Sequence, residues 1–320
     1  MDIRLIVGQM AVLFILIAVG FLAGKIKMLT RDGTKTLSKV VLNISTPCTI
    51  LNSVMGETGR ITGGSAMGFL LLVLLAYVLF FVIAIPLARA LGAAKRPKPE
   101  SGIRNLVSGD SSRWLYCAMM VFGNVGFMGF PVSQALFGPE STFYVAIFNT
   151  LFQLILFSLG IIMISGKSGN ISIRVLINAA FFSSLLSFAI VFTGFRPPGI
   201  IADTVRLTSG LNSPCAMLVI GATLSRVSVK DVFSKWRLYP ISVVKLLVMP
   251  VITWLIFKNF VTDSFLLGIL VLLSGMPMAA SLPIIAIEYG GDESSASGGI
   301  FLSTLISAAT VPLIAYLFIS

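Results

Sequence analysis

Apolar residues dominate the chain in long runs, and short polar or basic segments separate these runs. A helix needs about 20 mostly apolar residues to cross the hydrocarbon core of a bilayer. None of the connecting segments is long enough to form a domain of its own, so the pattern predicts one all-α polytopic membrane protein. The ten predicted spans are residues 5–24, 37–54, 65–92, 114–137, 142–165, 173–194, 202–224, 238–257, 264–288 and 296–318.

Composition and charge fit a membrane protein. The chain is 57% hydrophobic and 11% charged, with a mean hydropathy of +1.00, whereas soluble domains carry about 25% charged residues. The net charge is +11, and most basic residues fall in the loops after the first, third, fifth and seventh spans. Because positive loops mark the cytoplasmic side, we predict an inner-membrane protein with both termini on the non-cytoplasmic side. The basic surplus then reports topology and not a nucleic-acid partner.

The first apolar run, Leu5 to Ala23, could be mistaken for a signal peptide. In a cleaved signal the positive charge precedes the apolar run, whereas here Lys25 and Lys27 follow it. We therefore expect a retained span.

Short motifs recur in the same order in the two halves of the chain. "LNISTPCTIL" (42–51) resembles "LNSPCAML" (211–218). "GFPVSQALFGPES" (129–141) and "SLPIIAIEYGGDES" (281–294) each place six residues between a proline and a glycine. We predict two five-span repeats, residues 1–166 and 167–320. Because each repeat crosses the membrane an odd number of times, the second repeat has the opposite orientation in the membrane. Such inverted repeats are typical of secondary transporters.

The fourth and ninth spans carry helix-breaking residues at mid-depth: Gly123, Gly126, Gly129 and Pro131, and Gly275, Pro277 and Pro283. A proline removes one backbone donor and clashes with the preceding turn. Freed backbone groups at this depth are tolerated only inside protein or beside water. We predict two broken helices that cross at their breaks, with the positive ends of the half-helices facing one anion site. Ordinary kinks with small packing residues are the alternative.

Several polar residues at membrane depth are candidates for contact with substrate. Lys245 is the one basic residue deep in a predicted span, so it either attracts an anion or snorkels to an interface. The in-span amides either touch substrate or cross-link helices. The full set of predicted substrate-binding residues is Asn43, Asn124, Gly126, Gly129, Pro131, Asn149, Lys245, Pro277, Ser281 and Pro283.

The sequence does not favour an enzyme. It has no histidine, and its cysteines (Cys48, Cys117 and Cys215) fall within or beside spans without metal-ligand spacing. Hydrolytic chemistry needs an acid–base pair, a metal or an activated nucleophile. We therefore expect the protein to have no catalytic activity, no cofactor and no metal.

"NVGFMGFPVSQALFG" resembles the fourth span of the auxin efflux carrier family, and residues 281–318 resemble its ninth and tenth spans. "TPCTIL" in span two and "VVKLLVMP" in span eight also fit the family. The long cytoplasmic loop of the plant carriers is missing, as in short prokaryotic members. The resemblance implies a homodimer in which spans 1, 2, 6 and 7 form a scaffold and spans 3–5 and 8–10 form an elevator-type transport unit. It also implies an anion carboxylate near Asn124 and substrates such as auxin or malate.

The sequence thus predicts a secondary transporter for a small mono- or dicarboxylate. A sodium-coupled organic-anion symporter of the bile-acid type and an anion channel are the alternatives. Transport is expected to be driven by membrane potential or coupled to protons through Glu288, the acidic residue nearest mid-depth. An unchanged pH dependence of flux in Glu288→Gln would exclude the second route.

Overall fold

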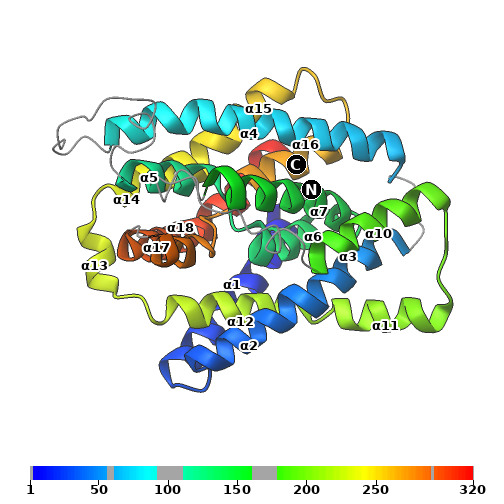
Figure 1. Cartoon of the computed structure of the whole chain (residues 1–320), viewed down its shortest axis with the longest axis horizontal. Helices are drawn as coiled ribbons and strands as arrows, with labels where there is room; N and C mark the ends of the chain where they lie inside the picture. The colour runs from blue at the N-terminus through cyan, green and yellow to red at the C-terminus, as the bar shows by residue number, and fades with distance from the viewer. Residues whose placement is uncertain (1–2, 56–60, 92–110, 161–178, 290–291, 320) are drawn as a thin grey trace.

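The computed structural model describes residues 3–55, 61–91, 111–160, 179–289 and 292–319 (Figure 1). Apart from one isolated β-bridge, the secondary structure in these ranges is helical. Figure 1 shows α4 along one long edge of the molecule, with α11 and α12 along the opposite edge. The broken helices discussed below lie between these edges.

The elements of the first half follow the predicted spans closely. They are α1 (Ile3–Lys25), α2 (Arg31–Val40), η1 (Val41–Ser45), α3 (Thr46–Met55), α4 (Gly63–Leu91), α5 (Ser111–Val121), η3 (Val125–Gly129), α6 (Phe130–Phe137), α7 (Ser141–Ile155) and η4 (Leu156–Gly160).

The second half continues with α10 (Ala179–Thr193), α11 (Gly199–Ser209), α12 (Asn212–Leu224), α13 (Val229–Ser234), α14 (Leu238–Val243), η5 (Val244–Val248), α15 (Met249–Phe257), α16 (Ser264–Ser274), α17 (Leu282–Tyr289) and α18 (Glu293–Ile319). The η elements are short π-helical turns.

Within the described residues, six helices are long and apolar enough to cross a membrane: Ile6–Lys25, Gly63–Leu91, Ser141–Gly160, Gly199–Leu224, Leu238–Phe257 and Glu293–Phe318. Shorter apolar helices cover Val125–Phe137, Ala179–Thr193 and Ser264–Ser274. Large apolar side chains such as Ile15, Leu71 and Val82 are exposed on the outer faces of α1 and α4. Contiguous apolar surface of this kind is costly in water and favourable against lipid.

Two segments differ in detail from the predicted spans. Helix α2 begins at Arg31, six residues before the predicted span, because Thr30 caps it by accepting a hydrogen bond from the Gly33 N–H. The predicted span 202–224 lies within the apolar helical stretch Gly199–Leu224, but a turn at Gly210 and Leu211 divides this stretch into α11 and α12.

Three π-helical turns stand directly before an Xaa-Pro pair. η1, η3 and η5 are followed after one residue by Pro47, Pro131 and Pro250. A proline ring clashes with the carbonyl four residues earlier and removes one donor. The wider π turn provides room for the ring, and helical structure continues past each of these prolines.

Helices α1 and α12 pack with their backbones in contact. A Cβ at Gly20 would lie 2.4 Å from the carbonyl oxygen of Leu218, and one at Gly221 would lie 2.0 Å from that of Ile17. Glycine is therefore required at both positions, as at other close contacts between membrane helices.

The arrangement of the chain as two inverted repeats stays a prediction. Its proposed boundary, between residues 166 and 167, lies outside the described residues.

Candidate functional site

Both predicted helix interruptions are present. Helix α5 ends at Val121, and helical structure resumes at Val125. Helix α16 ends at Ser274, and α17 begins at Leu282. The glycines and prolines of the two motifs thus produce two unwound segments, 122–124 and 275–281, at corresponding places in the chain.

The two unwound segments pair with each other. Gly123 and Met278 form an antiparallel bridge. The flanking bonds run from the Asn124 N–H to the Pro277 carbonyl oxygen (2.6 Å) and from the Ala279 N–H to the Phe122 carbonyl oxygen (3.0 Å). The Met278 N–H donates to the Ser303 hydroxyl of α18 at 3.1 Å. These bonds satisfy some of the backbone groups freed by the breaks within protein, as membrane depth requires.

Lys245 on η5 connects the ends of the two half-helices. Its ammonium donates to the carbonyl oxygens of Val121 (3.2 Å) and Ser274 (3.1 Å), which are the last residues of α5 and α16. The side chain is 1% exposed, and Nζ lies 5.7 Å from the centroid of the Phe80 ring. A helix C-terminus carries about half a negative charge, so one ammonium balances two such ends.

A cavity of about 420 Å³ adjoins the crossing. This volume lies within the range of small-molecule sites. The cavity wall comes from α2–η1–α3, from both unwound segments, and from η3, α7, η4 and α10. The lining residues are Lys35, Ser38, Lys39, Leu42, Asn43, Thr46, Gly123, Asn124, Val125, Gly126, Phe127, Asn149, Phe152, Gln153, Phe157, Ala180, Ala279, Ala280 and Ser281.

Two buried carboxamides line this cavity without a hydrogen-bond partner among the described residues. Asn124 is 3% exposed and Asn149 is 5% exposed. The polar atoms of these two amides are not among the fully enclosed unpaired atoms of the described residues, so they remain accessible from the cavity. Both side chains therefore offer free donors and acceptors to a molecule in the cavity.

The start of η3 adds backbone donors to the same wall. The N–H groups of Gly126 and Phe127 lie in its first turn and have no backbone acceptor within the described residues. The Asn124 carbonyl accepts the N–H groups of Met128 and Gly129 one turn later. Unpaired N–H groups at the positive end of a helix favour an anion.

The structure brings together half of the predicted substrate-binding residues. Asn43, Asn124, Gly126, Asn149 and Ser281 all line the cavity. The Asn43 side chain also donates to the Lys39 carbonyl oxygen at 3.1 Å.

The remaining predicted residues lie outside the described cavity lining. Gly129 faces the side chains of Leu273 and Val125. Pro131 is buried inside α6, Pro277 contributes its carbonyl to the crossing, and Pro283 lies in α17. Lys245 bonds to backbone carbonyls as described above. For Glu288 the structure describes the backbone, in α17, but not the side chain.

Lys35 and Lys39 belong to the cavity wall, although the sequence alone explains them as markers of the cytoplasmic side. Their spacing in the sequence could have indicated a place on the cavity wall. Lys35, Lys39 and Asn43 follow one another at four-residue intervals, which places them on one helical face. None of the described lining residues is acidic, so the wall carries a positive charge.

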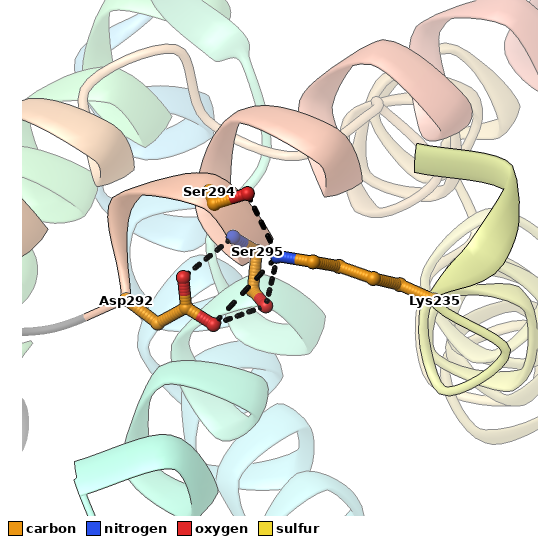
Figure 2. A network of polar contacts seen from close by, with 4 residues as sticks. All are labelled: Lys235, Asp292, Ser294 and Ser295. Carbon is orange, nitrogen blue, oxygen red and sulfur yellow. Dashed lines mark hydrogen bonds and ion pairs between the residues drawn. The ribbon is translucent and has the colours of Figure 1, made fainter. Parts of the chain in front are cut away.

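A second polar cluster connects α18 to the segment between α13 and α14 (Figure 2). Asp292 accepts from the N–H and the hydroxyl of Ser295, which caps the start of α18. The Lys235 ammonium donates to the hydroxyls of Ser294 (2.8 Å) and Ser295 (3.1 Å) and lies 3.8 Å from the Asp292 carboxylate. Burial acts to raise the pKa of Asp292, but the Ser295 hydrogen bonds and the charge of Lys235 together lower it below its ordinary value.

The sequence profile of a family described as Membrane transport protein matches residues 5–174 and 170–315, nearly the whole chain. An "Uncharacterized transporter" of Methanothermobacter thermautotrophicus is 28% identical over 308 residues, which is 93% of this chain and 94% of that protein. "Uncharacterized transporter YfdV" of Escherichia coli is 23% identical over 322 residues, covering 97% and 96%.

A third relative carries a more specific name. The "Putative malonate transporter" of Rhizobium meliloti is 25% identical over 207 residues, which is 61% of this chain and 64% of that protein.

Proposed function

Since this chain belongs to the Membrane transport protein family, that of the auxin efflux carriers, we propose that it is a secondary transporter for a small organic anion. The family makes it a multi-pass membrane transporter and not an enzyme. The anion, the mechanism and the orientation form the proposal. The observation that carries the proposal is the pair of buried, unpartnered carboxamides, Asn124 and Asn149, in the wall of a cavity at the helix crossing.

In this proposal a carboxylate binds at the crossing. Its oxygens accept hydrogen bonds from the free N–H groups of Gly126 and Phe127 and from the Asn124 and Asn149 amides. Ser281, on the second unwound segment, contributes a hydroxyl. The backbone dipole of η3 and α6 stabilises the negative charge without a buried arginine. Such a site favours an anion over a cation.

We propose transport by alternating access. The crossing joins α5–α6 to α16–α17 by backbone hydrogen bonds, which supports a joint movement of the two broken helices. We propose that spans 3–5 and 8–10 carry the anion past a scaffold of spans 1, 2, 6 and 7 in an elevator-type movement, within a homodimer. The cavity extends to Lys35 and Lys39, on the side predicted to be cytoplasmic, which supports an inward-facing state.

Malonate is the first ligand to test, because one relative bears the name of a malonate transporter. The test is uptake of labelled malonate into proteoliposomes, with counterflow to establish a carrier. Loss of the Asn124 amide should remove one hydrogen bond to a charged group, worth about 1.5–3 kcal/mol. Asn124→Ala should therefore raise the KM about 10- to 150-fold with normal folding.

Asn52→Ala is the matched control, because it removes an amide from α3 that does not line the cavity. Normal affinity in Asn124→Ala would contradict the proposed site. Flux that neither saturates nor shows counterflow would favour a channel. A strict requirement for a sodium gradient would favour a symporter of the bile-acid type, and an acceleration by protons would implicate Glu288.

A further inference from the structure

We propose that Lys35 and Lys39 form a cationic subsite at the mouth of the cavity, which selects anions that carry a second negatively charged group. This inference rests on the proposed function, because it concerns the far end of the same substrate. The first carboxylate binds at the crossing, and the second anionic group binds between the two ammonium groups.

The cavity is long enough for two binding positions. Lys35 and Lys39 lie on α2, and the same helical segment continues through η1 to Thr46, which also lines the cavity. At a rise of about 1.5 Å per residue, this wall extends about 17 Å from Lys35 to Thr46. A single carboxylate at the crossing occupies only the inner end of such a space.

The two ends of the cavity differ in charge. The inner end offers neutral donors: the amides of Asn124 and Asn149 and the hydroxyl of Ser281. The outer end offers two ammonium groups four residues apart, on one helical face. Neither lysine forms an ion pair with another described residue, and none of the described lining residues is acidic. Both positive charges are therefore available to a ligand.

A topological role alone does not account for these two positions. Lys25 and Lys27 lie in the same loop region, are exposed, and contribute equally to its positive charge, yet neither lines the cavity. These residues provide the matched control. Removing either pair changes the loop charge by the same amount, whereas only one pair faces the bound anion.

The experiment measures the affinity of the purified protein for adipate, a dianion whose two carboxylates are separated by four methylene groups, and for its monomethyl ester, a monoanion that retains one carboxylate. Malonate is too short for this test, because a single methylene separates its carboxylates. Wild-type protein should prefer adipate to its ester. Lys35→Gln/Lys39→Gln should weaken adipate binding about three- to tenfold, the range expected for two solvent-exposed ion pairs. It should leave ester binding unchanged, as should Lys25→Gln/Lys27→Gln for both ligands.

Ionic strength gives a second readout, since added salt screens exposed charges. The wild-type preference for adipate over its ester should shrink between 0.1 M and 1 M salt, and the preference of Lys35→Gln/Lys39→Gln should not. The proposal is overturned if the double variant keeps the wild-type preference or if wild type binds both ligands equally. In either case, weaker ester binding by Asn124→Ala leaves the proposed function intact. If wild type binds neither ligand, both proposals fail.

Discussion

Replacing Lys245 with methionine tests how the crossing is held together. Methionine has a similar volume to lysine but carries no charge and no donor. The substitution leaves the carbonyl oxygens of Val121 and Ser274 without the ammonium that now binds both. Two negative helix ends would then face each other inside the protein.

The expected loss follows from the contacts. Two hydrogen bonds from a charged group are worth about 1.5–3 kcal/mol each. Against this, methionine avoids the desolvation of a buried ammonium, which costs several kcal/mol. We therefore expect a net loss of stability of about 1–3 kcal/mol. For a chain of this size the corresponding fall in melting temperature is about 2–10 °C.

The assay combines thermal melting of the purified protein in detergent with the malonate affinity measurement. Lys245→Met should lower the melting temperature and weaken malonate and its ester by the same factor, because the crossing loosens as a whole. Lys245→Arg retains the charge and should lose less stability, although its larger planar group fits two carbonyls less well.

One result would refute the reasoning. If Lys245→Met melts like wild type but loses affinity for malonate, the ammonium contacts the substrate directly. Lys245 would then be a substrate-binding residue, as predicted from the sequence, and not a cap on the two half-helices.

Two further substitutions address the second polar cluster and the cavity. Asp292→Ala should remove the cap of α18 and cost about 1 kcal/mol, whereas Asp292→Asn keeps a capping oxygen and loses only an exposed ion pair. Because the pKa of Asp292 is lowered in the folded protein, its contribution is present above about pH 4 and is lost as the pH falls further. Melting curves from pH 3 to 6 should show this loss in wild type but not in Asp292→Asn. Gly126→Ala places a methyl group 3.7 Å from the Asn149 Oδ1 without a clash, so the protein should fold normally and bind malonate more weakly. Gly68→Ala, whose methyl meets no atom within 4 Å, should leave binding unchanged.

The positions of the helices could be predicted because a bilayer restricts the possibilities. Every backbone group at membrane depth must be satisfied, so a long apolar run has to be helical. The same rule made the exceptions visible: glycines followed by Pro131, and Gly275 with Pro277, indicated interruptions that the structure contains. The turn between α11 and α12 could not be predicted in this way. Its sequence contains a single glycine, Gly210, and single glycines are common in membrane helices.

The candidate site was only half predictable. Asn124 and Gly126 lie inside the motif that breaks the helix, so their place at the crossing follows from local sequence. Asn149 and Ser281 were predicted as in-span polar residues, and the fold brings them to the same wall. By contrast, the contact of Lys245 with two helix ends joins residues more than 28 positions apart. No local pattern specifies it.

The lysines of the protein are divided between two tasks, stabilising the helix crossing and attracting an anion, which one buried positive charge could otherwise perform together. A lysine inside the cavity would bind an anion strongly but would also cost desolvation whenever the site is empty. Here the buried ammonium of Lys245 is compensated by two backbone carbonyls. The cavity itself offers neutral amides at its inner end and water-exposed lysines at its mouth. In the proposed mechanism, an anion held by such groups can be released as well as bound, and a carrier needs both steps on every cycle.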